Sequence, residues 1–142
     1  MSEIQVTKET CTPTAKDAKD ALEFALWHSA NRTEVPLIQD FSPGIYIRTI
    51  NIPKNCTFTT ELHKTEHFFV ILEGEYLVWT DEGEPEHIVA PCMDRTIPGT
   101  RRVVQTLTPV KWMTIHANPT NETDEDKLRE MIIETERINP YF

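Results

Sequence analysis

The amino-acid sequence predicts a single, mainly β domain, built as a sandwich or barrel of short strands with a helix at either end. Between residues 44 and 116, short runs rich in β-branched and aromatic residues alternate with Gly and Pro turn signals, a pattern typical of all-β sandwiches and barrels. The segments on either side show apolar residues at helical spacing. A length of 142 residues suits one hydrophobic core, so we expect one domain over residues 1–142.

The N-terminal segment is predicted to contain the first helix. Residues 1–12 are polar, and we expect them to be loosely structured. Further along, the apolar residues Ala18, Leu22 and Ala25 recur at intervals of three or four. This spacing predicts a short amphipathic helix over residues 14–31.

The strands are expected within residues 44–116, where each run of β-forming residues stops at a turn signal. Short strands at such close spacing favour a closed barrel or a sandwich. The runs are residues 45–52, 57–63, 68–72, 75–80, 87–90, 96–97, 102–107 and 110–116.

The C-terminal segment returns to helical spacing. Thr123 is the expected N-cap, and acidic residues 124–126 fall in the first turn, where negative charge interacts favourably with the helix dipole. Leu128 and Ile132 lie on one face. These signals predict a helix over residues 123–137. We interpret both helices as covers on the β core, with a dimer contact through their exposed faces as the alternative.

Composition argues against several classes of partner. The chain has 23 Asp and Glu against 14 Lys and Arg, a net charge of −9, and no basic run, so no nucleic-acid partner is expected. The longest apolar run, residues 68–72, is too short to span a bilayer, and the N-terminus does not resemble a signal peptide. Cys11, Cys56 and Cys92 form neither a CxxC pair nor a disulfide framework. We therefore expect a cytoplasmic protein without a membrane partner.

His63 and His67 bracket the tripeptide Lys-Thr-Glu and so match the H-x-x-E-H signature of a class of zinc proteases. That signature requires a helix, whereas the flanking residues here are β-branched and aromatic and end in a turn. We therefore expect a β-hairpin and no protease activity. In two strands joined by residues 64–66, Glu61 and His63 share one face and His67 opens the facing strand.

Glu61, His63 and His67 are consequently candidate metal ligands. Carboxylate and imidazole donors suit a divalent metal ion such as Zn, Fe, Mn or Ni. The alternative interpretation is that the two histidines form hydrogen bonds within a polar barrel end, without a metal. For Glu61, metal ligation and a buried ion pair with Arg102 are equally open.

At these residues the chain resembles the cupin superfamily. The first cupin motif has the form H-x-H, three or four residues, E, six residues, G, and Glu61, His63, His67 and Gly74 occupy that frame with two ligand types exchanged. The resemblance implies a cupin-like jelly-roll β-barrel over residues 44–116. It also implies a ligand set of two histidines and one carboxylate, and a homodimer.

The second cupin motif is a Pro-Gly turn followed by a fourth ligand histidine. Here the turn falls at residues 98–99, and Arg102 stands at the histidine position. Arginine stays protonated and does not ligate a metal, so its guanidinium is expected either to pair with Glu61 or to bind an anionic group of a ligand.

Two further residues are candidate ligand-binding positions. His116 shares strand parity with Trp112 and is a candidate replacement for the missing fourth ligand, with capping of the strand as the alternative. Phe69 shares parity with His67, so an inward-facing histidine would lie in a partly apolar cavity suited to a small organic molecule. The alternative for Phe69 is simple core packing.

A narrower resemblance links residues 63–67, 90–92, 98–103 and 112–116, with the acidic helix that follows, to small cupin-like proteins encoded by tailed phages. It implies a viral origin, with the host cytosol or the virion as the location, but no substrate or catalytic residue. The leading hypothesis is a phage-type cupin that binds a divalent metal and a small anionic molecule, with metal-dependent catalysis left open. The alternatives are a non-catalytic accessory scaffold that contacts other virion proteins and a metabolite sensor without turnover.

Overall fold

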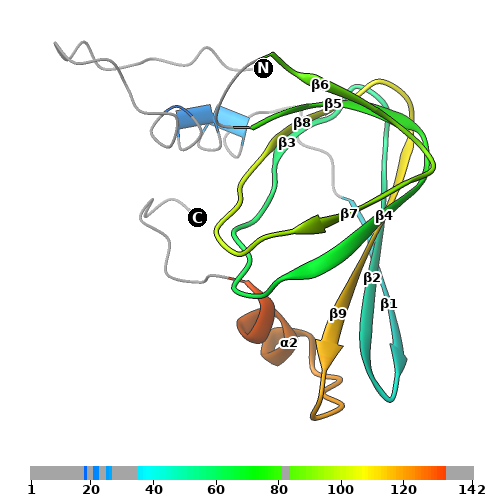
Figure 1. Ribbon diagram of the computed structural model, residues 1–142, viewed down its shortest axis with the longest axis vertical. Coiled ribbons are helices and arrows are strands. Elements are labelled where there is room, and N and C mark those ends of the chain that lie inside the picture. Colours follow the sequence, from blue (N-terminus) through cyan, green and yellow to red (C-terminus); the bar gives the residue numbers. More distant parts are fainter. Residues whose placement is uncertain (1–17, 19–20, 23–24, 27–34, 81–83, 134–142) are drawn as a thin grey trace, which may run out of the picture.

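The structure is a computed structural model that describes residues 35–80 and 84–133, together with residues 18, 21–22 and 25–26. Within these residues, nine strands form two antiparallel sheets and one helix, α2, follows them (Figure 1). The predicted mainly β fold is therefore confirmed.

Strand order within each sheet differs from chain order, as a jelly roll requires. The larger sheet has the order β1-β2-β9-β4-β7, and the smaller has the order β3-β8-β5-β6. The strands are β1 (Leu37–Ser42), β2 (Gly44–Ile52), β3 (Thr57–Thr59), β4 (His67–Glu73), β5 (Glu75–Trp79), β6 (Glu86–Val89), β7 (Cys92–Thr96), β8 (Val103–Thr106) and β9 (Val110–Asn118).

The hydrophobic core lies between the two sheets. Along β4, Phe69 and Ile71 are buried whereas Phe68 and Leu72 are exposed, as expected for a strand with one face on the core. The main cluster of buried residues draws on both sheets and consists of Ile52, Phe69, Ile71, Tyr76, Val78, Val104, Val110 and Trp112.

The predicted hairpin between residues 57–63 and the strand that follows is wrong. Strand β3 pairs with β8 in the smaller sheet, whereas β4 pairs with β7 and β9 in the larger sheet. Residues 60–66 therefore cross from one sheet to the other. Local sequence reports the tendency to form a strand, but the partner of a strand is decided by tertiary packing.

The predicted barrel begins too late. Strand β1 precedes residue 44 and pairs with β2 over its whole length, from the Leu37–Ile50 pair to the Ser42–Ile45 pair. The five described residues between 18 and 26 are helical, as predicted for residues 14–31. The rest of that predicted helix, and residues 1–12, lie outside the described residues.

Helix α2 (Glu125–Ile132) lies at one end of the barrel, near the end of β9 (Figure 1). Its N-cap is Asp124 and not Thr123 as predicted, because the Asp124 side chain accepts a hydrogen bond from the backbone N–H of Lys127 at 3.1 Å. The helix also ends earlier than the predicted residue 137, since Ile133 is extended. No helix among the described residues is long and apolar enough to cross a membrane.

Candidate metal centre

Three histidine side chains meet at the end of the barrel where α2 lies. His67 begins β4, His116 lies near the end of β9, and His63 lies in the crossing segment 60–66. The ring centroid of His67 is 4.5 Å from that of His63 and 4.3 Å from that of His116, and the other two centroids are 6.1 Å apart. We call these three residues the histidine cluster.

Backbone pairing holds each of the three side chains in place. The β2–β9 register sets His116 opposite Tyr46, and their rings are 5.9 Å apart between centroids. His67 shares the inward face of β4 and is 6% exposed, and His116 is 2% exposed. His63 forms an isolated bridge with Ile133, directly after α2. The cluster therefore depends on both the larger sheet and the end of helix α2.

The ring nitrogens of the cluster are unevenly satisfied. His67 Nδ1 lies 3.1 Å from the carbonyl oxygen of Thr65, so Nδ1 carries the proton and Nε2 keeps a free lone pair. His116 Nε2 lies 2.8 Å from the hydroxyl oxygen of Thr114. Among the described residues, the buried Nδ1 atoms of His63 and His116 have no hydrogen-bond partner. Each such buried polar atom costs about 1–3 kcal/mol when it stays unsatisfied.

All three imidazoles are held in the neutral form. Burial lowers the pKa of His116 to about 2 and the pKa of His63 to about 4, and in each case a neighbouring imidazole lowers it further. Burial also lowers the pKa of His67. The guanidinium of Arg48 contributes to the lowered pKa of all three side chains. Neutral imidazole is the form that ligates a metal.

The donor set fits a divalent metal in chemistry and approximately in geometry. Imidazole nitrogens suit Zn, Fe and Ni, with Zn–N bonds of about 2.1 Å, which places the centroids of ligating rings roughly 5 Å apart. The distances in the cluster bracket that value. Over residues 35–80 and 84–133, however, no three His, Cys, Asp or Glu side chains are arranged as a ready metal-binding group. Side-chain rotation is therefore needed to turn the nitrogens toward a common point.

The side chain of Glu61 contacts helix α2. Its carboxylate forms an ion pair with Arg129. The guanidinium of Arg102 lies over the ring of Phe69, 5.4 Å from the centroid. Burial lowers the pKa of Arg102. Arg129 is thus a partner of Glu61 that was not predicted, and the pair of Glu61 with Arg102 stays a prediction.

Phe69 occupies the interior, as its parity with His67 predicted. It is 6% exposed, belongs to the main core cluster and lies 5.4 Å from the ring of Trp112 between centroids. The side chain therefore connects the histidine end of the barrel to the packed core beneath it.

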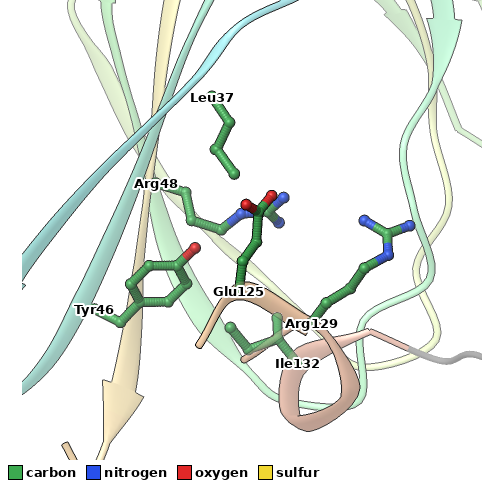
Figure 2. Close-up of a pocket in the computed structure, with 6 residues that line it drawn as sticks. All are labelled: Leu37, Tyr46, Arg48, Glu125, Arg129 and Ile132. Atoms are coloured by element: carbon green, nitrogen blue, oxygen red, sulfur yellow. The ribbon is translucent and has the colours of Figure 1, made fainter. Parts of the chain in front are cut away.

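A small pocket beside the cluster contains residues that no sequence motif marks. Leu37, Tyr46, Arg48, Glu125, Arg129 and Ile132 line it, from the larger sheet and from α2 (Figure 2). Arg48 is an inward-facing, half-buried charge in the middle of an apolar strand. That position was the signal available in the sequence, because charged residues are rarely buried without a specific role.

Comparison with solved structures finds proteins of the same fold. An uncharacterized conserved protein with a double-stranded β-helix domain from Klebsiella pneumoniae subsp. pneumoniae is similar with a TM-score of 0.52 and 11% identity, over 66% of this chain and 85% of that chain. KdgF from Halomonas sp. gives a TM-score of 0.52 and 10% identity, over 69% and 90%. A putative ethanolamine utilization protein Q from Salmonella typhimurium gives 0.50 and 23%, over 65% and 75%.

These similarities define the fold alone, because every identity is below 25%. The fold is the cupin-type double-stranded β-helix, which agrees with the architecture expected from the two motifs. No family model matches the chain, and no curated protein matches its sequence.

Proposed function

We propose that this cupin-fold protein binds a divalent transition metal through His63, His67 and His116, and that it holds a small anionic molecule beside the metal. The observation that carries the proposal is the convergence of three neutral imidazoles, two of which have a buried ring nitrogen without a partner. A bound metal ion would satisfy those nitrogens. It would also offset the cost of burying them.

Three protein ligands leave a coordination position open for a second molecule. In such a site a metal polarises a carbonyl group or activates water. His67 is oriented for ligation by the Thr65 carbonyl, since the proton on Nδ1 leaves Nε2 available. The Thr114 hydroxyl engages Nε2 of His116, and in the tautomer in which Nε2 donates that hydrogen bond, Nδ1 keeps its lone pair for a metal.

Two arginines supply the positive charge that an anionic ligand needs. Arg102 lies over Phe69, and Arg48 is close enough to lower the pKa of every histidine in the cluster. A guanidinium recognises carboxylate or phosphate with paired hydrogen bonds. A small carboxylate or phosphate ester is therefore the ligand class that this end of the barrel suits best.

The proposed ligand set differs from the sequence-based set at one position. Glu61 was the predicted third ligand, but its carboxylate is engaged by Arg129, whereas His116 lies within the cluster. Glu61 as a ligand stays a prediction, and the two sets are separable by mutation. His116→Gln should remove the metal if the three-histidine set is correct, and Glu61→Gln should remove it if the sequence-based set is correct.

The direct test is metal stoichiometry. The full chain is loaded separately with Zn²⁺, Mn²⁺, Ni²⁺ and Co²⁺, freed of excess metal and analysed by elemental mass spectrometry. We expect about one metal ion per chain in the parent, little in His116→Gln, and absorption bands of Co²⁺ bound to nitrogen donors. His87→Gln is the matched control, since His87 is an exposed histidine hydrogen-bonded to Glu75, away from the cluster.

Failure of the parent to retain any of these metals would contradict the proposal. It would favour the second candidate function, a non-catalytic accessory scaffold that uses the barrel for protein contacts. One observation supports that candidate: large apolar side chains such as Phe68 and Met93 are exposed on the larger sheet. A phage origin and a place in the virion stay predictions from the resemblance.

A further inference from the structure

Helix α2 and the larger sheet form a pocket between them at the histidine end of the barrel (Figure 2). On α2, Glu125, Arg129 and Ile132 stand at i, i+4 and i+7 and therefore share one face of the helix. On β2, Tyr46 and Arg48 stand two residues apart and share the inward face of the strand. These side chains line the pocket together with one residue of β1. We call it the α2 pocket.

The α2 pocket has apolar walls and room for a small molecule. Leu37 of β1 and Ile132 lie on either side of the charged groups in the view of Figure 2, and Ile132 is buried in a cluster with Tyr46. The pocket holds about 230 Å³ of space without protein atoms, part of it open to solvent. At about 30 Å³ for each water-sized group, this space accommodates roughly seven or eight non-hydrogen atoms.

Two guanidiniums and one carboxylate face this space. Arg48 extends from β2 toward α2, and Glu125 and Arg129 project from the helix (Figure 2). Glu61 engages Nη2 of Arg129, and a guanidinium carries five N–H donors, so Arg129 can bind a second anion. With Glu61 included, two positive and two negative charges surround the pocket. Such a site is complementary to a molecule that itself carries one charge of each sign.

The buried Tyr46 side chain positions Arg48. Its hydroxyl donates a hydrogen bond to Oε1 of Gln39 at 2.9 Å, and Gln39 stands opposite Arg48 in the β1–β2 register. Burial raises the pKa of Tyr46, whereas the charge and the hydrogen bond of Arg48 act in the opposite direction. The phenol thus donates to Gln39 and accepts from Arg48. A guanidinium held in this way loses less conformational entropy when a ligand binds.

We propose that the α2 pocket binds an α-amino acid with a short apolar side chain. The guanidiniums of Arg48 and Arg129 bind its carboxylate with paired hydrogen bonds. The carboxylate of Glu125 binds its ammonium group, and the apolar walls contact its side chain. A ligand with only a carboxylate would be repelled by Glu125, and a ligand with only an amine would be repelled by the guanidiniums. This inference goes beyond the proposed function, because no residue of the histidine cluster lines the pocket and binding needs no metal.

The test is calorimetric titration of the metal-free full chain, in chelator, with L-valine, isovalerate and isobutylamine. The three probes share a branched carbon skeleton, but isovalerate lacks the ammonium group and isobutylamine lacks the carboxylate. We expect L-valine to bind, and each of the other two to bind at least about ten-fold more weakly. A parent that does not bind L-valine at about 10 mM, or that binds isovalerate equally well, overturns the proposal.

Exchange of one charge tests the role assigned to Glu125. Glu125→Gln should weaken the binding of L-valine by about ten-fold and strengthen that of isovalerate, because the repulsive carboxylate is gone. Asp126→Asn is the matched control, since Asp126 carries the same charge in the same turn of α2 but does not line the pocket. It should leave both affinities unchanged. Arg48→Gln should weaken both ligands.

Glu125 is exposed, so its substitution leaves the core intact, and circular dichroism establishes that each variant is folded. Equal effects of Glu125→Gln and Asp126→Asn, or no gain of isovalerate binding in Glu125→Gln, overturn the proposal. The titration contains no metal, so its result is independent of the metal centre. A parent that binds L-valine but retains no metal contradicts the proposed function alone, and a parent that retains metal but does not bind L-valine contradicts this inference alone.

Discussion

The buried Nδ1 of His116 predicts that replacing this buried side chain costs the metal-free protein little stability. Without a metal, this nitrogen destabilises the folded state, since it has no hydrogen-bond partner among the described residues. We expect His116→Leu to leave the stability of the metal-free protein within about 1 kcal/mol of the parent, because the removed nitrogen offsets the lost hydrogen bond to Thr114. The same variant should lose the stabilisation that added metal gives the parent.

Urea unfolding in the presence of a chelator, and again with saturating Zn²⁺, measures both effects. His87→Gln, an exposed position, should behave as the parent under both conditions. A loss of more than about 2 kcal/mol for His116→Leu in chelator would show that the imidazole has a structural role independent of a metal.

Acid should destabilise the metal-free protein through the same side chains. The pKa of His63 in the folded protein is about 4 and that of His116 about 2, both below the usual 6.5. Above pH 6.5 neither state is protonated, and as pH falls below 6.5 the unfolded chain binds protons that the folded chain does not. Stability therefore falls, by up to about 1.4 kcal/mol per pH unit for each histidine.

The measurement is the free energy of unfolding in urea between pH 7 and pH 4.5, in chelator. His63→Gln should show a shallower decline than the parent over this window. Parallel curves for the two proteins would mean that His63 is not held neutral in the folded state.

Single residues of the site were predictable where a motif or strand parity marked them. His63 and His67 stand in the frame of the first cupin motif, and the parity of His116 with Trp112 placed it inward. The ion pair between Glu61 and Arg129 was not predictable, because Arg129 lies on a helix that approaches only in the folded chain. Arg48 was not predicted, because it belongs to no motif and its sequence signal is only an isolated charge in an apolar strand.

The connection between β4 and β5 depends on a single glycine. Gly74 has a φ of +97°, and a Cβ added there would lie 2.1 Å from the backbone oxygen of Pro109. Backbone cannot move aside as a flexible side chain does, so Gly74→Ala should destabilise the domain by at least about 3 kcal/mol.

Gly44→Ala is the matched control for that variant. Gly44 also has a positive φ, of +75°, but a Cβ there would meet nothing within 4 Å. It should cost only about 1 kcal/mol, from backbone strain alone. Thermal unfolding of both variants makes the comparison, and equal losses would contradict the close approach of the β8–β9 connection to Gly74.

Helix α2 closes the histidine end of the barrel through contacts with the crossing segment. The backbone N–H of Lys64 donates to the carbonyl of Ile132 at 2.7 Å, and the Lys64 ammonium donates to that of Glu130 at 2.9 Å. The ion pair between Glu61 and Arg129 adds a third tie. We therefore expect a shift of α2 to increase access to the cluster.

Arg129→Ala should loosen this closure with little effect on global stability, because a partly exposed ion pair contributes only about 0.2–1 kcal/mol. We expect bound metal to transfer from Arg129→Ala to a chelator several-fold faster than it does from the parent. Lys127→Ala, at an exposed position on the same helix, is the control. Equal rates in all three proteins would show that α2 does not limit access.

At the element scale, local sequence identified the strands better than their partners. The alternation along β4 predicted its inward residues correctly. The hairpin between residues 57–63 and β4 was wrong, because the short segment 60–66 joins strands in different sheets and its length does not distinguish a turn from a crossing. The β1 strand lies outside the predicted barrel, because the Pro43-Gly44 turn signal does not by itself distinguish the start of the barrel from a turn between two of its strands.

For the whole molecule, the two faces of the larger sheet differ in character. Its inner face holds the histidine cluster, and its outer face carries exposed apolar side chains such as Phe68 and Met93. His67 and Phe68 are adjacent in the chain yet point to opposite sides. The sequence predicted a cupin-type barrel, but not this division, because outward apolar rows become visible only when five strands are in register.

This separation predicts that a substitution on the outer face leaves metal binding intact. Phe68→Glu should still retain about one metal ion per chain, since the substitution lies on the outer face and leaves the inward side chains of β4 in place. His116→Leu should lose the metal, because its ring lies inside the barrel, in the histidine cluster. Elemental analysis of both variants, with circular dichroism to establish that each is folded, makes the comparison. Loss of the metal from folded Phe68→Glu would instead show that packing on the outer face holds β4 in the geometry that the histidine cluster needs.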